Sequence, residues 1–205
     1  MPEVGEGTLV VEKTPAYFVK REIPARIAAM NPGTKLILVL RDPVTRAISD
    51  YTQSYAKGRT SKSFAEMAFT DYPKNKVVNQ RWNGIRLGLY ERHLRKWLPY
   101  FPLNQIHIVD GEQLISDPVA ELHALEAFLQ LPHYINQDQF SFNSSKGFPC
   151  VRRHPDDADF RCLGATKGRT HPQLSPPTLA TLRAFFRPHN AALSNLLPRR
   201  LPWLS

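Results

Sequence analysis

The most informative stretch of this chain is KLILVLRDP, from Lys35 to Pro43. Its first part, Lys35–Leu40, is a short and almost continuous apolar run between the turn signal Asn31–Gly33 and a polar Arg-Asp pair. Such a run is typical of a parallel strand that is buried on both faces. A helical pattern, Thr45–Lys57, follows it closely, so the sequence predicts the strand–loop–helix unit of an α/β domain.

Further helices and strands are expected on both sides of this unit. Upstream, Thr8–Val11 is β-prone and Val19–Met30 has a helical pattern. Downstream, the patterns predict a helix over Trp82–Leu98, a strand over Ile106–Val109, a helix over Pro118–Leu129 and a last helix over Ser175–Phe186 that Ser175 can cap. Between Asn136 and Pro172 we expect a long polar loop region, a kind of segment that often carries function. Neither repeats nor linkers divide the chain.

The composition narrows the choice of partners. Of the 205 residues, 42% are hydrophobic, which suffices for the core of one domain. Lys and Arg number 27 against 18 Asp and Glu, a formal charge of +9. This excess favours nucleic acid, anionic membrane, sulfated glycan or nucleotide phosphates, although a basic surface without such a partner explains the charge equally well. No stretch approaches the roughly 20 apolar residues of a membrane-spanning helix, and the polar segment Met1–Gly7 does not have the pattern of a signal peptide.

The two cysteines, Cys150 and Cys162, leave two interpretations open. They could close a small disulfide loop in an oxidising compartment, or they could be two free thiols. His154 and His171 lie in the same region, but the spacing matches no common zinc site. We therefore expect no metal site in this chain.

Three polar clusters could hold an anion. The first cluster is EKTPAYF, Glu12–Phe18, where Lys13 and Thr14 would point from a strand end into the crevice in which α/β sheets bind ligands. A simple surface turn is the alternative there. The third cluster is KGRTH, Lys167–His171, where two cations flank Gly168 and the glycine lets the backbone approach an oxyanion closely.

The second cluster is RDPVTRAISDYTQ, Arg41–Gln53. Arg41 leaves the predicted strand and Ser49 lies two helical turns into the next helix, so a guanidinium and a hydroxyl can converge on a phosphate monoester. The alternative is structural, with a capped helix start and an ion pair between Arg46 and Asp50. Neither a Walker-type loop nor a Ser-His-Asp arrangement is present. The residues alone therefore predict an α/β domain with three anion-holding corners.

In this order, the clusters resemble the heparan sulfate glucosamine 3-O-sulfotransferases, over about Val11 to Asn190. The segments that carry the resemblance are EKTPAYF (Glu12–Phe18), LRDPVTRAISDYTQ (Leu40–Gln53), FPL and IHIVDGE (Phe101–Glu112), KGFPC (Lys146–Cys150) and CLGATKGRTHP (Cys162–Pro172). The GFPC and KGRTH forms are more similar to the subgroup linked with herpesvirus-receptor heparan sulfate than to the anticoagulant one. The resemblance implies a P-loop-type sulfotransferase fold with a central parallel sheet flanked by helices.

The same resemblance implies a reaction and its residues. The donor would be 3′-phosphoadenosine 5′-phosphosulfate (PAPS), with nucleotide contacts from Arg41, Ser49, Lys167, Gly168, Arg169, Thr170 and His171. Lys13 would lie beside the transferred sulfuryl group as a catalytic cation. The implied saccharide contacts are Lys13, Thr14, Pro15, Ala16, Asp50, Gln53, Lys57, Trp82 and Asn83. The reaction would be in-line transfer to a glucosamine 3-hydroxyl, with a Glu base and cations that stabilise the developing negative charge.

Further properties follow from the resemblance. It implies heparan sulfate as the partner, no metal requirement, a monomer and a place in the Golgi lumen. The resemblance implies that Cys150 and Cys162 form the disulfide found in this family. It also implies that Asn143, in the sequon Asn143-Ser144-Ser145, is glycosylated. We do not expect a nucleic-acid partner, because the chain has neither interleaved aromatic and basic residues nor a helix-turn-helix pattern.

Members of this family begin the fold with a strand, a phosphosulfate loop and a helix, followed by the base Glu. All of these are expected to precede residue 1. The resemblance therefore implies that residues 1–205 are a partial sulfotransferase domain, and we expect the isolated chain to be unstable and inactive. The alternative interpretation is a non-catalytic remnant that still binds heparan sulfate.

Overall fold

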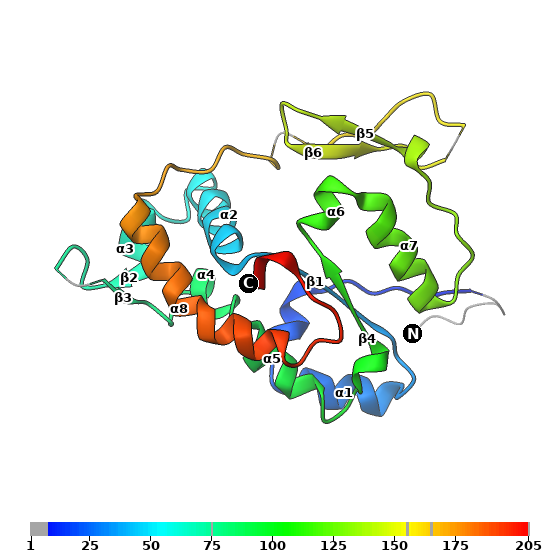
Figure 1. Ribbon diagram of the computed structural model, residues 1–205, viewed down its shortest axis with the longest axis horizontal. Helices are drawn as coiled ribbons and strands as arrows, with labels where there is room; N and C mark the ends of the chain where they lie inside the picture. The colour runs from blue at the N-terminus through cyan, green and yellow to red at the C-terminus, as the bar shows by residue number, and fades with distance from the viewer. Residues whose placement is uncertain (1–7, 75, 155, 165, 205) are drawn as a thin grey trace.

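A parallel pair of strands lies at the centre of the molecule (Figure 1). β1 spans Leu36–Leu40 and β4 spans Ile106–Asp110, and the register runs from Leu36 opposite Ile106 to Leu40 opposite Asp110. The computed structural model describes residues 8–74, 76–154, 156–164 and 166–204. The first seven residues, in which no signal peptide is predicted, lie outside this part. The predicted parallel strand pair is confirmed.

Helices flank the strand pair, as an α/β fold requires. α2 (Pro43–Ala56) and α8 (Pro176–Ser194) lie on one side of β1 and β4 in Figure 1, and α7 (Pro118–Leu129) lies on the other. The remaining helical elements are η1 (Pro15–Val19), α1 (Ile23–Met30), α3 (Phe64–Ala68), α4 (Asn83–Arg86), α5 (Tyr90–Trp97), η2 (Leu103–Gln105), α6 (Gln113–Ser116), η3 (Gln137–Gln139) and η4 (Pro202–Leu204). No helix in the described ranges is long and apolar enough to cross a membrane.

The core consists of two apolar clusters. One packs along β1 and β4, and its most buried members include Leu40, Leu94, Phe101, Ile108 and Leu193. The other joins α2 to α8 and the helices between them, and includes Val44, Ala47, Ile85, Leu182 and Phe186. Since β1 ends in the first cluster and α2 begins in the second, residues 41 and 42 lie where the two clusters meet.

One face of β1 is more exposed than the sequence predicts. The apolar run predicts burial on both faces, but Ile37 and Val39 are 42% and 57% exposed in the described part of the chain. Leu36 and Leu38, on the opposite face, are partly buried against the first core cluster. Side chains alternate along a strand, so one covered face leaves every second residue open.

The predicted helix over residues 82–98 is wrong in one respect, because it is two helices. α4 ends at Arg86 and α5 begins at Tyr90, with Gly88 between them. A Cβ atom at Gly88 would lie 3.0 Å from the Pro43 side chain and 3.1 Å from the Phe186 ring. The break therefore lets α2 and α8 approach this segment closely, a tertiary cause that the helical period does not reveal.

Two expectations near the N-terminus are also corrected. Residues 8–11 form no strand, because a β-prone run becomes a strand only when a neighbouring strand supplies hydrogen bonds, and no described strand pairs with it. The expected helix from residue 19 begins four residues later, at Ile23. Pro24 explains this start, because proline suits the first turn of a helix, where its missing N–H costs no hydrogen bond.

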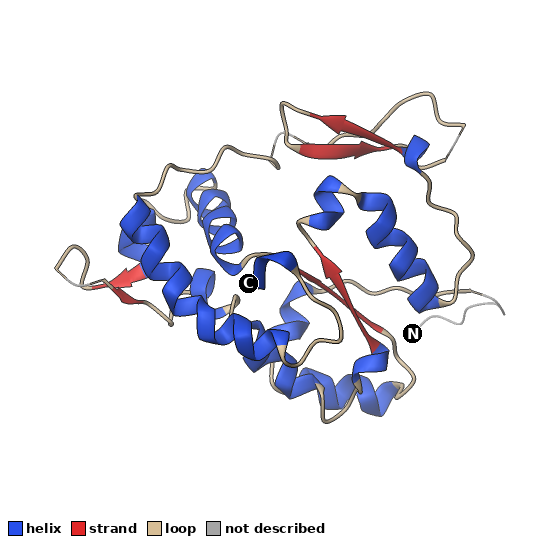
Figure 2. Cartoon of the chain, in the orientation of Figure 1, coloured by secondary structure: helices blue, strands red, loops and turns tan. Residues whose placement is uncertain are grey.

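The polar region of residues 136–172 contains an antiparallel hairpin that the sequence did not predict (Figure 2). β5 (Phe140–Asn143) pairs with β6 (Phe148–Val151), and a shorter pair joins β2 (Phe69–Thr70) to β3 (Val77–Val78). The last helix is longer than expected, since it continues through Pro188 to Ser194. Ser175 makes no capping hydrogen bond to the backbone and instead donates from its hydroxyl to the Thr178 hydroxyl at 3.0 Å.

Candidate functional site

Two oppositely charged side chains meet where the parallel strands end. Arg41 is the first residue after β1, and Glu112 is the second residue after β4. Arg41 Nε donates to Glu112 Oε1 at 3.0 Å, and Arg41 Nη2 donates to Glu112 Oε2 at 3.1 Å. The two side chains are 25% and 35% exposed. This two-pronged contact leaves the other N–H groups of the guanidinium for a ligand.

The turn after β4 is closely fitted to the end of β1. The Gly111 N–H donates to the Leu40 carbonyl at 2.6 Å, and a Cβ on Gly111 would lie 2.9 Å from that same oxygen. Asp110 is fully buried, and its Oδ1 accepts from the Glu112 N–H at 2.9 Å and from Trp203 Nε1 at 3.2 Å. These contacts fix the position of Glu112 beside Arg41.

The start of α2 shows both features of the structural alternative for the second cluster, namely a capped helix start and an ion pair between Arg46 and Asp50. Asp42 caps the helix, accepting from the Thr45 N–H at 2.6 Å. Arg46 pairs with Asp50 at 3.5 Å and also donates to the backbone carbonyl of Gly84. Arg46 is therefore committed to holding α4 against α2. The Arg41 side chain takes part in none of these contacts, so they do not compete with its predicted binding of a phosphate.

Tyr90 supports the same corner from α5. Its hydroxyl donates to the Arg41 carbonyl at 3.0 Å. Burial raises the pKa of Tyr90 to about 12, and the charge of Arg46 and the bond to Arg41 only partly oppose this effect. The phenol is therefore neutral at all physiological pH values and remains a hydrogen-bond donor that anchors the backbone at Arg41.

The third cluster lies against the second. Arg169 Nη1 donates to Gln53 Oε1 on α2 and to the Thr166 carbonyl. Partial desolvation lowers the pKa of His171, the charge of Arg41 lowers it further, and the charge of Glu112 opposes both. These charges act on His171 because it lies near the Arg41–Glu112 pair. The structure thus brings together two segments that are more than a hundred residues apart.

A glycine is required in the third cluster. Gly168 has a positive φ of 62°, and a Cβ there would lie 2.9 Å from the Lys146 carbonyl. Only glycine combines that conformation with this close approach. The third cluster is therefore held between the hairpin β5–β6 on one side and α2 on the other.

The other predicted site residues are placed as follows. Ser49, Asp50 and Gln53 lie on α2 and Lys57 ends it, whereas Trp82 and Asn83 open α4, which Arg46 ties to α2. Lys167 and Thr170 are exposed in the third cluster. The first cluster stands apart: Lys13 is exposed, Thr14 donates to Glu12 at 2.5 Å, and Pro15 and Ala16 open η1. Among the described residues, no hydrogen bond or ion pair joins the first cluster to the other two.

The prediction of a disulfide is confirmed. Cys150, on β6, and Cys162 are bonded to each other. Asn143, the predicted glycosylation site, ends β5, and its Nδ2 lies 3.8 Å from Cys162 Sγ. Ser145 donates its hydroxyl to Asn143 Oδ1 at 2.7 Å. The disulfide thus ties the hairpin to the segment that leads into the third cluster.

Two surface pockets do not coincide with this site. The larger, of about 550 Å³, lies at the base of the hairpin and is lined by Asn136, Gln137, Asp138, Phe140, Ser141, Arg152 and Phe160. The smaller, of about 200 Å³, lies between the start of α2 and the C-terminal segment. Neither includes Arg41, Ser49 or Lys167. In the described part of the chain, the candidate site is therefore defined by contacts between charged and polar side chains, and neither of these two pockets coincides with it.

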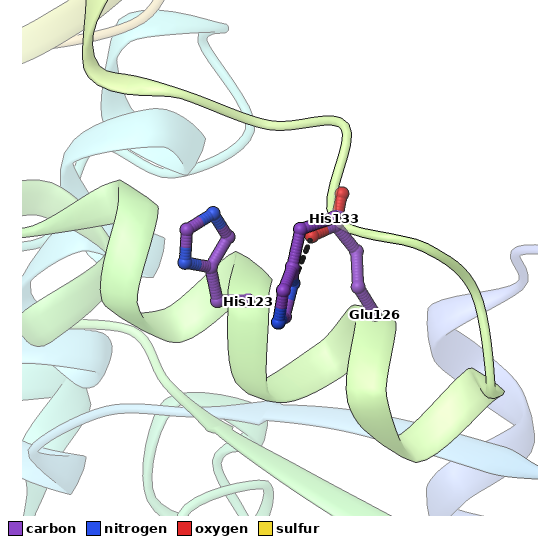
Figure 3. A group of neighbouring side chains, drawn as sticks. All are labelled: His123, Glu126 and His133. Carbon is purple, nitrogen blue, oxygen red and sulfur yellow. Dashed lines mark hydrogen bonds and ion pairs between the residues drawn. The ribbon is translucent and has the colours of Figure 1, made fainter.

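One further cluster, His123, Glu126 and His133, was not anticipated from the sequence (Figure 3). One potential metal-ligating atom from each residue lies within 4.8 Å of the others. His133 Nδ1 bonds Glu126 Oε2 at 3.0 Å, and His123 Nε2 bonds the Ile135 carbonyl at 2.6 Å. Glu126 Oε1 also accepts hydrogen bonds from two backbone N–H groups of the segment after α7. Hydrogen bonds therefore account for this cluster, which ties that segment to the end of α7. That no metal is needed stays a prediction.

Comparison with known proteins places the chain in a family. The model of the sulfotransferase domain family matches residues 19–193. Heparan sulfate glucosamine 3-O-sulfotransferase 3A1 of Mus musculus is 46% identical over 203 residues, which cover 99% of this chain and 51% of the relative. The corresponding 3B1 protein of Homo sapiens is 44% identical, with 99% and 52% covered. The chain thus spans about half the length of these curated relatives.

A solved structure agrees with the fold. The crystal structure of a sulfotransferase from Alicyclobacillus acidocaldarius superposes with a TM-score of 0.65 at 23% sequence identity, and the match covers 92% of this chain and 65% of that one. At this identity the likeness concerns the fold alone. Because the family model covers most of the chain and the fold agrees with it, the chain belongs to the sulfotransferase domain family.

Proposed function

We propose that the chain is part of an enzyme that transfers a sulfuryl group from PAPS to the 3-hydroxyl of glucosamine in heparan sulfate. The observation that carries this proposal is that the third cluster meets the second: Arg169 donates to Gln53 on α2, and the charge of Arg41, the first residue after β1, acts on His171. Ligands of α/β sheets bind at the carboxyl ends of the strands. The names of the relatives, at 44–46% identity, supply the substrate class.

The nucleotide would lie between α2 and the third cluster. Arg41 has unused N–H donors and Ser49 lies on the helix that follows, so both can hold the 3′-phosphate. Lys167 and the backbone at Gly168 suit a second anionic group of the same nucleotide. His171, whose pKa is lowered, would contribute a neutral imidazole that donates one hydrogen bond.

The saccharide would follow the outer face of α2. Asp50, Gln53 and Lys57 are spaced by three and four residues, so they share one face of this helix and its end. Arg169 touches the middle residue of this row, which brings the donor and acceptor regions together. Lys13 would stabilise negative charge on the sulfuryl oxygens while a carboxylate base takes the proton of the attacking hydroxyl.

The chemistry of the chain suits a secretory compartment. A disulfide persists where the surroundings are oxidising, and Asn143 stands in an N-glycosylation sequon. We therefore infer that the protein works as a glycoprotein in the secretory pathway, and the resemblance to the family favours the Golgi lumen. That it is a monomer and requires no metal is proposed from the same resemblance alone. Fractionation of cells, together with digestion by an N-glycosidase, tests both the compartment and the modification.

Thermal unfolding of the chain with nucleotides tests the donor site. Adenosine 3′,5′-bisphosphate should raise the melting temperature, and a concentration of 100 times Kd corresponds to about 2.7 kcal/mol. Adenosine 5′-monophosphate is the control and should have a much smaller effect, since it lacks the 3′-phosphate. Equal effects of the two nucleotides, or none, would contradict the assignment. Transfer of radiolabelled sulfate from PAPS to heparan sulfate tests the reaction itself, and transfer by the isolated chain would contradict the expectation that residues 1–205 are inactive alone.

A further inference from the structure

Glu112 engages Arg41 along one edge of its guanidinium. The carboxylate contacts one edge of the guanidinium, formed by Nε and one N–H of Nη2. The opposite edge, which includes Nη1, makes no such contact with Glu112. An arginine has five N–H donors in a rigid plane, so a carboxylate on one edge does not prevent an anion from binding the other.

The position of Glu112 is itself built into the fold. Its N–H is held by the buried side chain of Asp110, which Trp203 also contacts. The Asp110 N–H in turn donates to Glu121 at 3.0 Å, and Arg199 pairs with Glu121 at 2.8 Å. The turn that carries Glu112 is therefore braced from α7 and from the C-terminal segment.

These contacts distinguish two roles for Glu112. As an internal substitute for the ligand, it would be displaced when a phosphate arrives, and its removal would tighten binding. As a support, it would stay in place and aim the free edge of Arg41. The braced turn favours the second role, since displacement would have to break two charge-assisted bonds to a carboxylate whose backbone is fixed.

We propose that Glu112 is a positioning residue that holds the Arg41 guanidinium so that its free edge faces the 3′-phosphate of the nucleotide. This inference rests on the function proposed above. Glu112 touches neither the donor nor the acceptor. It acts through Arg41, and its effect should therefore be confined to ligands that carry the phosphate bound by Arg41.

The test compares Glu112→Gln and Glu112→Ala with the unchanged chain. Glu112→Ala frees the guanidinium to rotate, so Kd for adenosine 3′,5′-bisphosphate should rise roughly tenfold, because the charge-assisted bonds that orient Arg41 are lost. Glu112→Gln keeps one accepting oxygen, so its Kd should lie between that of the unchanged chain and that of Glu112→Ala. Kd for adenosine 5′-monophosphate should change less than twofold in both variants, because that ligand offers no 3′-phosphate. A variant that only destabilised the fold would weaken the binding of both nucleotides equally.

A matched control is Glu66→Gln. Glu66 forms the capping box of α3 with Ser63, and glutamine can fill the same position. This variant removes one carboxylate of the chain without touching Arg41, so it should bind both nucleotides as the unchanged chain does. Tighter or unchanged binding of the bisphosphate by Glu112→Ala would overturn the proposal.

A second readout needs no nucleotide. In the nuclear magnetic resonance spectrum, the Nε–H signal of Arg41, assigned with Arg41→Lys, should show slow exchange with water in the unchanged chain and fast exchange in Glu112→Ala. Melting temperatures of the two should agree within about 2 °C, because an ion pair that is still reached by solvent stabilises little. An identical Arg41 signal would overturn the positioning role. If the unchanged chain binds no bisphosphate, the proposed function fails, and this signal still decides whether Glu112 holds Arg41.

Discussion

At the scale of single residues, Gly111 directly follows β4 and lies against the end of β1. A Cβ there would meet the Leu40 carbonyl at 2.9 Å and the Arg41 side chain at 3.3 Å. Neither neighbour can move without disturbing a strand end or the Arg41–Glu112 pair. The requirement for glycine is therefore one of space, and it lies within the candidate site.

We expect Gly111→Ala to lower the free energy of unfolding by roughly 1–3 kcal/mol, the usual effect of forcing an extra group into a packed region. Urea denaturation followed by tryptophan fluorescence measures it. Gly164→Ala is the control, because nothing lies within 4 Å of a Cβ at that position. An effect of equal size in the two variants would show that the close approach at Gly111 has no energetic importance.

At the scale of elements, the hairpin β5–β6 supports the third cluster. Its turn presents the Lys146 carbonyl to Gly168, and the disulfide joins β6 to the segment before the cluster. The bridged cysteines are separated by 12 residues in the sequence. The disulfide is therefore a covalent link between the hairpin and the segment that leads into the third cluster.

Replacing both cysteines, as Cys150→Ser with Cys162→Ser, should lower the free energy of unfolding by about 3 kcal/mol, as the chain-entropy model gives for a loop of this length. Binding of adenosine 3′,5′-bisphosphate should weaken as well, because the third cluster loses its support. Calorimetry measures both effects. A reductant should reproduce them in the unchanged chain and have no effect on the double variant. A melting temperature unaffected by the reductant would contradict this.

At the scale of the whole molecule, a buried and a partly buried histidine contribute to the response of stability to pH. Burial lowers the pKa of His93, on α5, and of His107, on β4, and is the largest cause for both. The unfolded chain therefore binds protons more readily than the folded one near pH 6.5. By linkage, stability rises with pH in that window and is lost as the pH falls from about 6.5 towards the lower pKa values of the folded state.

Urea denaturation at pH 7.5 and pH 5.5 should thus give a smaller free energy of unfolding at the lower pH. His107→Asn should weaken the dependence, because it removes one of the groups that the folded state keeps neutral. His154→Asn, a change of an exposed histidine on the surface, is the control and should leave the dependence as it is. Stability that stayed constant or increased on acidification would contradict the assignment.

The sequence allowed the parallel strands, α2 and α7 to be predicted, because each has a local pattern that fits its environment. The break at Gly88 depends on Pro43 and Phe186, which are distant in the sequence, so no local period shows it. Arg41 was found from its place after a strand. Glu112 was not, although the DGE segment after β4 was noted, because its role depends on the register that sets Asp110 opposite Leu40. The cluster of His123, Glu126 and His133 likewise forms only when the chain folds back on α7.

The contact between Arg169 and Gln53 has a thermodynamic consequence for the enzyme that we propose. One side chain of the donor region and one of the acceptor region share a hydrogen bond, so whatever orders one partner also orders the other. Coupling between two sites is reciprocal, because both ligands draw on the same free energy. Occupancy by nucleotide should therefore raise affinity for the oligosaccharide by the same factor as the oligosaccharide raises affinity for nucleotide, with neither needing to be the first to bind.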